Sequence, residues 1–287
     1  MTGVQTCALP ILSTNPLAFY MRQPKIYIRL PSNGQFWPEG SLEISENGEY
    51  AVYSMTAKDE LALKVPDALM NGQAVVDVLQ HCIPAIKNGW DCPNLDLDVI
   101  LIAIRLATYG ELMATPVKIG DLDLEYQVDL RILMDTLQQQ ITWNPIIPVS
   151  DELTVFVKPL TYRNASQAAI QSFETQKIMN VVNDEKISEE QKIKLFKESF
   201  SKLTNATLST ITDSIDRIES AHGSTDNPEY IKDFVSNIDK EIYSKIENHL
   251  TELRERNTIK PMRVAVTDEM REKGIAGEFV EIGRAHV

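Results

Sequence analysis

The stretch from Leu97 to Met113 constrains the fold more than any other part of the sequence. Between Val99 and Ala107 every residue except Arg105 is apolar. At the spacing of an α-helix these residues occupy several stripes, so a helix here has to be covered on all sides. The run is far shorter than the roughly 20 residues that cross a bilayer. It therefore predicts a buried central helix, which ends at Gly110 because glycine readily adopts the left-handed αL conformation that closes a helix.

Strand patterns lie on both sides of this helix. Alternating or short apolar runs predict strands at Lys25–Leu30, Ser41–Ile44, Glu49–Met55, Thr115–Ile119, Leu124–Val128 and Thr154–Leu160. Asn47-Gly48 favours a hairpin that joins the second and third of these strands, because both residues tolerate the positive φ of a tight turn. Pro31, Asn33 and Gly34 predict the preceding loop.

Shorter helices are expected at about Gly72–Cys82 and Leu130–Gln140, and after Thr56. Thr56 can accept hydrogen bonds from the first turn of its helix. Asp59 and Glu60 then place negative charge at the positive end of the helix dipole.

Arg105 is the polar residue that needs an explanation, because its guanidinium stays charged inside an apolar run. We expect Asp59 or Glu60 to form a structural ion pair with it. The alternative is that Arg105 contacts an acidic group of a partner.

From Tyr162 onward the pattern becomes helical and richer in Lys, Glu, Ser and Thr. Ser188 with Gln191 matches a capping box, and Asn227 caps a helix that tolerates Pro228 in its first turn. Apolar stripes follow: Ile193, Phe196, Phe200 and Leu203; Leu208, Ile211, Ile215 and Ile218; and Ile231, Val235, Ile238, Ile242, Ile246, Leu250 and Leu253. The first two stripes are out of register at Thr204-Asn205, and residues 223–227 are expected to turn between helical arms. Amphipathic helices need a partner face; we favour an intramolecular hairpin over another chain.

The two ends of the sequence resemble translated sequencing adapter. Residues 1–11, MTGVQTCALPI, can be encoded by a short-read adapter, and residues 282–287, IGRAHV, by its reverse complement, which continues into a stop codon. Such segments are set aside in fold reasoning. We expect native sequence at about 12–281, open at both ends, with one positive charge fewer because Arg284 is removed.

The sequence therefore predicts an α+β fold. An N-terminal mixed domain with β-hairpins around the buried central helix is expected at residues 12–160. A mainly α-helical C-terminal arm is expected at 161–256, followed by a truncated C-terminal segment at 257–281.

The chain is acidic, with 28 Lys and Arg against 41 Asp and Glu and a formal charge of −13. Binding to nucleic acid and adsorption to anionic lipid both depend on a basic surface, so this charge argues against either. We expect protein partners, bound through a basic surface on the partner. A homo-oligomer is an alternative.

The sequence has no Walker A, dinucleotide-binding, zincin or nucleophile-elbow motif, so no cofactor is expected. Cys82 and Cys92 are too isolated for the clustered ligand pairs of a tetrahedral zinc site. A site at His81 and Cys82 remains an alternative to two simple thiols.

Asp91, Asp96 and Asp98 surround Pro93 and are interpreted as turn and helix-cap residues. A small hydrolase that uses carboxylates is the lower alternative. No catalytic, cofactor-binding or metal-ligating residue is assigned.

Several segments, in order along the chain, resemble a known family: LPSNG at 30–34, SMTAKDE at 54–60, VPDALMNGQAVVDVLQHCIP at 65–84 and LDLDVILIAIRLATYG at 95–110. They are similar to the baseplate hub assembly proteins of T-even-type tailed phages, over about 29–160 and more weakly to NTIKPM at 257–262. The motif residues with a structural role are Leu30, Pro31, Ser32, Gly34, Met55, Thr56, Asp59, Glu60, Gly72, Pro84, Arg105, Tyr109 and Gly110.

The resemblance implies protein–protein contacts with the hub and tail proteins of a contractile-tail baseplate, without catalysis, in the host cytoplasm during virion assembly. Retention in the virion as a structural subunit of the hub is the alternative. Many relatives carry a Cys-Pro-x-Cys motif after the Tyr-Gly, where this sequence has ATPVKIGDLDLEYQVDL. The resemblance therefore brings no metal to this chain.

Overall fold

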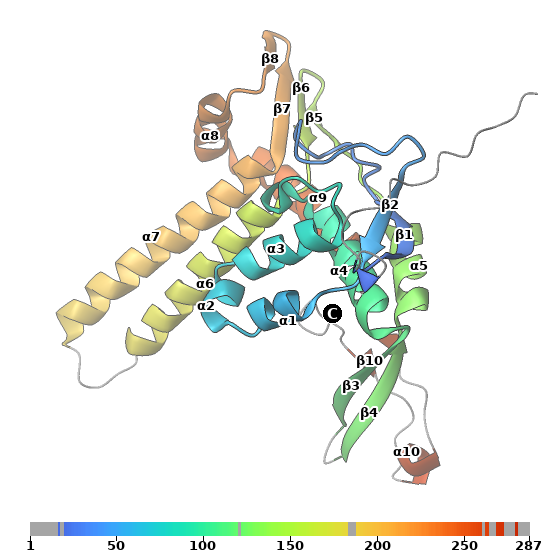
Figure 1. Cartoon of the computed structure of the whole chain (residues 1–287). Helices are drawn as coiled ribbons and strands as arrows, with labels where there is room; N and C mark the ends of the chain where they lie inside the picture. The colour runs from blue at the N-terminus through green and yellow to red at the C-terminus, as the bar shows by residue number, and fades with distance from the viewer. Residues whose placement is uncertain are drawn as a thin grey trace, which may run out of the picture.

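The computed structural model describes residues 17, 20–119, 122–182, 188–259, 262–263, 268–272 and 279–280. Helices and antiparallel sheets occur together, with a helical C-terminal region, so the predicted α+β fold is confirmed (Figure 1). Residues 1–11 and 282–287, which resemble adapter, lie outside the described residues, as does Gly120-Asp121.

Helix α4 (Asn94–Tyr109) is the centre of the N-terminal half. One side of it packs against the core formed with strands β1 (Pro24–Arg29) and β2 (Glu49–Tyr53) and helix α3 (Gln73–Cys82). Its other side packs against helix α5 (Leu130–Gln140) and the base of the hairpin of strands β3 (Leu112–Ile119) and β4 (Leu122–Asp129). Burial on both sides confirms the predicted central helix and explains its nearly continuous apolar sequence.

The ends of α4 differ from the prediction. The helix begins at Asn94, three residues earlier than expected, because Pro93 has the extended conformation of an N-cap residue. Its C-cap Gly110 has a φ of +92° and a ψ of −169°, which is not the αL conformation we expected. This ψ sends the chain directly into β3, so Leu112 and Met113 are strand residues and not helical ones.

Strand β1 (Pro24–Arg29) pairs with β2 (Glu49–Tyr53), so the predicted hairpin between Ser41–Ile44 and the third strand is wrong. Residues 41–43 pair with the 85–88 loop: Glu43 N donates to Ala85 O at 2.8 Å, and Lys87 N donates to Ser41 O at 2.8 Å. The predicted turn is nevertheless present, with Gly48 at a φ of +71°.

The other local predictions of this half hold. Its remaining elements are α1 (Ala57–Leu63), α2 (Pro66–Met70), α3 (Gln73–Cys82), the 3₁₀ helix η2 (Gly89–Asp91), β3 (Leu112–Ile119), β4 (Leu122–Asp129) and α5 (Leu130–Gln140). Thr56 caps α1 in a full capping box with Asp59, as its position predicts. Strands β3 and β4 form an antiparallel hairpin that projects from the end of α4 (Figure 1).

A second core lies in the C-terminal half, around an antiparallel sheet with strand order β5-β6-β7-β8. The strands are β5 (Ile146–Ser150), β6 (Leu153–Val157), β7 (Ile215–Ser220) and β8 (Gly223–Thr225), and helices α8 (Pro228–Asn237) and α9 (Lys240–Arg256) pack on them. Strand β5 was not predicted. Its Pro148 fits an edge strand, where the missing N–H breaks no ladder.

Ile215 and Ile218 were predicted to continue a helix, but they lie in β7. The register of β6 and β7 shifts between Phe156 and Val157, so that Asp216 is an extra residue of a β-bulge. The bulge lets two residues three positions apart face the same core. A spacing of three between core-facing residues is typical of a helix, so the sequence pattern here wrongly indicated one.

Helices α6 (Tyr162–Val182) and α7 (Glu189–Asp213) form an intramolecular hairpin, but it is not the predicted one. The turn expected at residues 223–227 between two helical arms is wrong, because these residues follow strand β7 and include strand β8. Helices α6 and α7 lie side by side and project away from both cores (Figure 1). The capping box of Ser188 and Gln191 starts α7, and Asn227 caps α8, as predicted. Short elements follow α9: β9 (Met262–Arg263), α10 (Asp268–Glu272) and β10 (Phe279–Val280).

Within the described part of the chain, none of the helices combines the length and the apolar character needed to cross a bilayer.

The apolar stripes differ in burial, which leads to a prediction. Ile246→Ala should lower the free energy of unfolding by about 2–5 kcal/mol, because Ile246 is fully buried and its truncation leaves a cavity. Ile193→Ala, the same truncation in α7, should change it by less than about 0.5 kcal/mol, since Ile193 is 55% exposed. Urea unfolding followed by circular dichroism measures both. Equal losses would contradict the division into a buried and an exposed stripe.

Candidate functional site

The LPSNG segment is held by one buried carboxylate. Ser32 N donates to Asp96 Oδ1 at 2.8 Å, while Ser32 Oγ and Trp37 Nε1 donate to Asp96 Oδ2 at 2.5 and 2.8 Å. Asp96 is fully buried, in the first turn of α4. Burial raises the pKa of its carboxyl, against the lowering effect of the hydrogen bonds from Ser32 and Trp37. Asp96 thus binds a distant loop, which is more than the local cap predicted for it.

The turn itself follows from its residues. Pro31 stands second in a turn in which Asn33 N donates to Leu30 O at 2.9 Å, a position that suits the fixed φ of proline. Leu30 is buried. Gly34 has a φ of +79°, and a Cβ there would lie 2.9 Å from Ile44 Cδ1. The LPSNG motif therefore specifies a turn that places Ser32 within hydrogen-bonding distance of Asp96.

A second buried carboxylate, Asp59, joins α1 to α3. Its Oδ1 lies 2.8 Å from His81 Nδ1, and its Oδ2 accepts from Thr56 N at 2.8 Å. Burial raises the pKa of Asp59, but the hydrogen bonds from Thr56 and His81 outweigh it, so the pKa is lowered. Next to this group, Met55 N donates to Thr108 Oγ1 at 2.9 Å and fastens the end of β2 to α4.

Cys82 is fully buried behind His81, and burial raises the pKa of its thiol to about 11. Arg22 Nη1 lies 3.9 Å from its Sγ. Cys92 is also buried, and it is not in a disulfide. Among the described residues no group of three or more His, Cys, Asp or Glu side chains could hold a metal ion.

The ion pair predicted for Arg105 is wrong. In the described part of the chain neither Asp59 nor Glu60 lies within ion-pairing distance of it, and its buried Nε has no hydrogen-bond partner. Its guanidinium instead stacks on Tyr109, with Cζ 5.4 Å from the ring centroid. Asp59 is bound by Thr56 and His81. Partial burial, together with the charge of Glu60 and a hydrogen bond to it, raises the pKa of Tyr109.

Gly72 lies where the α6–α7 hairpin meets the N-terminal half. It has a φ of +81°, and a Cβ there would lie 3.1 Å from Tyr162 Oη and 3.2 Å from Trp90. Trp90 and Tyr162 stack at 5.7 Å between centroids, and the Arg163 Cζ lies 5.2 Å from the Trp90 ring centroid. Tyr162 N also donates to Cys92 O at 2.7 Å. These contacts fix the base of the hairpin.

Pro84 occupies the corresponding second position of the turn after α3, where Ile86 N donates to Ile83 O at 2.9 Å. The predicted motif residues thus occupy several places around α4 and do not converge on one cleft. Asp96, Trp37, Trp90 and Tyr162, which organise these places, were not predicted as site residues. The sequence shows Asp96 as an acidic residue in the first turn of an apolar helix. Its hydrogen-bond partners, Ser32 and Trp37, are far away in the sequence and could not be predicted from it.

Helix α7 exposes a row of large apolar side chains on one face, which is unusual for a monomer. Ile193, Phe196, Phe200 and Leu203 are 55%, 48%, 64% and 46% exposed. They follow each other at 3-4-3 spacing, so they form one continuous stripe. Contiguous exposed apolar surface of this kind marks protein interaction sites.

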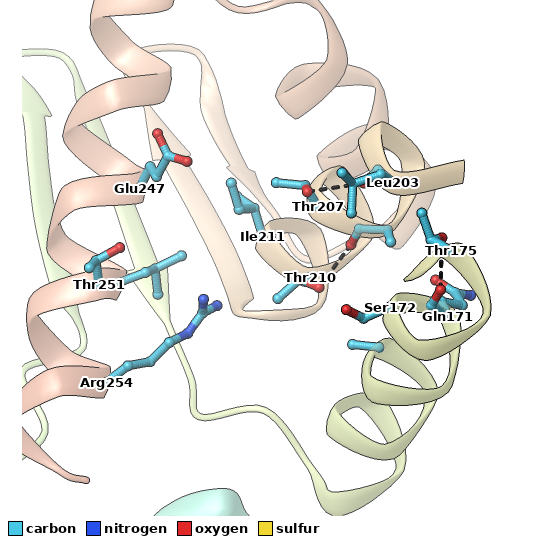
Figure 2. Close-up of a pocket in the computed structure, with 13 residues that line it drawn as sticks. Gln171, Ser172, Thr175, Leu203, Thr207, Thr210, Ile211, Glu247, Thr251 and Arg254 are labelled. Carbon is cyan, nitrogen blue, oxygen red and sulfur yellow. Dashed lines mark hydrogen bonds between the residues drawn. The ribbon is translucent and has the colours of Figure 1, made fainter. Parts of the chain in front are cut away.

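The stripe leads into a groove of about 250 Å³ where α6, α7 and α9 meet (Figure 2). Thr207 and Thr210 of α7 line it opposite Thr251 and Arg254 of α9. Thr207 and Thr210 donate to carbonyls of their own helix, whereas Arg254 points from α9 into the groove (Figure 2).

A family model described as T4 bacteriophage base plate protein matches residues 23–267. The chain belongs to this family. Membership gives the protein a structural role in the baseplate of a phage tail, in contact with other tail proteins. No curated protein matches the chain, and no solved structure matches it.

The Asp96 network of this baseplate protein gives a stability prediction. Asp96→Asn should lower the free energy of unfolding by about 2–3 kcal/mol, because the amide removes one acceptor and leaves a buried donor of Ser32 or Trp37 unpaired. Asp135→Asn on exposed α5 surface is the matched control, with a change within about 0.5 kcal/mol. Urea unfolding followed by tryptophan fluorescence measures both. A loss at Asp96 no larger than the control would show that the network contributes little.

Asp59 gives a pH prediction. Its folded pKa is lowered, so its ionised form stabilises the fold above the unfolded aspartate pKa of about 3.9, and this contribution is lost as the pH falls through the lowered folded value. The difference in unfolding free energy between the wild type and Asp59→Asn should therefore shrink as the pH falls below about 4. Urea titrations between about pH 5 and pH 2 measure it. A difference that grows as the pH falls through this range would contradict the sign.

Proposed function

We propose that the protein is a baseplate hub assembly protein that acts by protein–protein binding, without catalysis. The observation that carries the proposal is the apolar stripe of α7, exposed on a hairpin that is fixed at its base. An exposed apolar stripe of this length lowers the solubility of a protein, and a partner that covers it accounts for its presence. Membership of the baseplate family supports a partner within the tail.

The resemblance of the LPSNG and following segments to hub assembly proteins supports the hub as the place of action. In this fold those segments surround α4 and hold the N-terminal half together. They are the part of the chain from which the α6–α7 hairpin projects, so they set the direction of the stripe.

The burial of the perturbed titratable groups favours binding over catalysis. Asp96 and Cys82 are both 0% exposed, and each is enclosed by groups of its own chain. A catalytic acid or nucleophile has to reach its substrate. Asp96 and Cys82 are therefore assigned structural roles. The His81 side chain is 49% exposed, and its structural role rests on its contact with Asp59 at 2.8 Å.

The proposed place of action is the host cytoplasm during virion assembly, with the hub and other tail proteins as partners. The net charge of −13 favours at least one basic partner, and binding to it should weaken with salt. The alternative is a structural subunit that stays in the hub. Its contacts would be the same, so only its presence in the finished particle distinguishes it.

Co-expression tests the proposal. The chain should form a complex with hub proteins of the same phage that survives size exclusion, and Asp135→Asn, which changes only an exposed side chain, should bind equally. Failure to associate with any tail protein would overturn the proposal. Mass spectrometry of purified virions then separates the two forms of it: absence of the chain indicates an assembly factor, and stoichiometric presence indicates a retained subunit.

A further inference from the structure

The spacing of the α7 stripe is that of a coiled-coil seam. Ile193 and Phe200 stand at a positions of a heptad and Phe196 and Leu203 at d positions, with the seam continued by the small polar Thr207 and Thr210. All six residues belong to one uninterrupted helix. From the first to the last the seam measures about 25 Å at 1.5 Å per residue.

The hairpin partner α6 does not cover this seam. The two helices meet through smaller side chains, and Thr175 of α6 and Ser199 of α7 are 8% and 1% exposed. Ser199 is at a g position, to one side of the seam. Ile193, Phe196 and Phe200 therefore stay exposed beside the intramolecular contact, while Leu203, Thr207 and Thr210 line the groove.

A lysine borders the middle of the seam, although the whole chain is acidic. Between residues 190 and 204, α7 carries Lys192, Lys194, Lys197 and Lys202 against Glu190 and Glu198. Lys197 occupies the e position between Phe196 and Phe200, from which a coiled-coil helix contacts the charges of its partner, and Glu190 occupies the e position ahead of the first seam residue.

The groove at the other end of the seam contains a cation without an ion-pair partner. Among the described residues no carboxylate pairs with the Arg254 guanidinium, which points toward α7 (Figure 2). Its neighbours partly desolvate it, and burial lowers its pKa, although the group remains charged. Glu247 lines the same groove two turns earlier on the same face of α9, at about 10 Å along the helix axis.

The charges disfavour an antiparallel second copy of the chain as the occupant. In an antiparallel pair centred on the stripe the two Lys197 side chains would face each other. Like charges at these positions discriminate against a pairing.

We propose that the α7 seam, with the groove that ends at Arg254, binds an amphipathic α-helix of another tail protein whose apolar seam is flanked by Asp or Glu. This inference rests on the proposed binding function and names the chemistry of the partner. A helix supplies the knobs for the holes between the a and d residues of α7. Its carboxylates pair with Lys197 along the seam and with Arg254 at the groove.

A membrane surface fits the same features less well. Anionic lipid is repelled by the net charge of −13. The seam also ends in threonines inside a concave groove, where the opposite wall is α9. A concave surface between helices accepts another helix and not a flat interface.

The test uses the full chain and two synthetic helical probes of about 21 residues, three heptads with leucine at a and d. One probe has glutamate at e and g, and the other has lysine. Fluorescence anisotropy should show binding of the glutamate probe and at least about tenfold weaker binding of the lysine probe. Phe196→Ser/Phe200→Ser should weaken binding of the glutamate probe by at least about tenfold, and Lys197→Glu should reduce the preference for the glutamate probe over the lysine probe.

Controls keep the result specific to this face. Leu61→Ser changes another exposed side chain, 64% exposed on α1, and Lys232→Glu/Lys240→Glu removes lysines from α8 and α9. Both should leave the glutamate probe unaffected. The inference would be overturned by equal binding of the two probes or by binding of the glutamate probe that survives Phe196→Ser/Phe200→Ser. It would also be overturned if the chain forms a dimer that this variant abolishes, or if it binds anionic vesicles and not the probe.

The inference and the proposed function fail in different ways. If the wild type binds hub proteins and Phe196→Ser/Phe200→Ser binds them equally well, the function stands and this face is not its site. If the wild type binds no tail protein, the proposed function is lost, and the probes still decide what chemistry the seam accepts.

Discussion

The fold depends on a carboxylate that is buried where water cannot reach it. Asp96 accepts three donors from the loop between β1 and β2, and none of those donors has another partner of comparable geometry in the network. Because each unsatisfied buried group costs about 1–3 kcal/mol, the loop, the first turn of α4 and Trp37 have to be placed together or not at all. The apolar faces of α4 then pack β1 and β2 on one side and α5 on the other. A single polar anchor thus fixes this loop to the helix that both apolar cores share.

The same framework directs the hairpin that carries the candidate interface. The start of α6 is bound to the N-terminal half by Tyr162, which stacks on Trp90 and crowds Gly72. Its first turn is joined to the end of α7, where Asn164 Nδ2 donates to Asp213 Oδ2 at 2.9 Å. Both contacts lie at the base, so the outer part of α7 keeps its orientation without being covered. Rigid presentation of an exposed seam lowers the ordering cost of binding.

Local signals could be predicted from the sequence, and non-local ones could not. The caps at Thr56, Ser188 and Asn227 depend on neighbours within four residues, and all of them form. The pairing of β2 with β1 was missed because the Asn47-Gly48 turn favoured a nearer partner. The β-bulge at Asp216 gave Ile215 and Ile218 the spacing of a helix. For the site, the sequence provided the apolar stripe of α7 but not its exposure, since burial depends on what else packs there.

The net charge of the chain favours a basic partner, whereas the charges that border the α7 seam favour an acidic one. The bordering charges decide what binds at the seam. The formal charge of −13 describes the whole surface and governs encounter at distances within a Debye length, about 8 Å at physiological salt. Contact at the seam is governed by the few groups that border it, among them Lys197 in its middle and Arg254 in the groove. A basic partner guided by the overall field would meet like charges at this face, which argues for a separate acidic helix here. The acidic remainder of the surface is then left for the basic components of the tail.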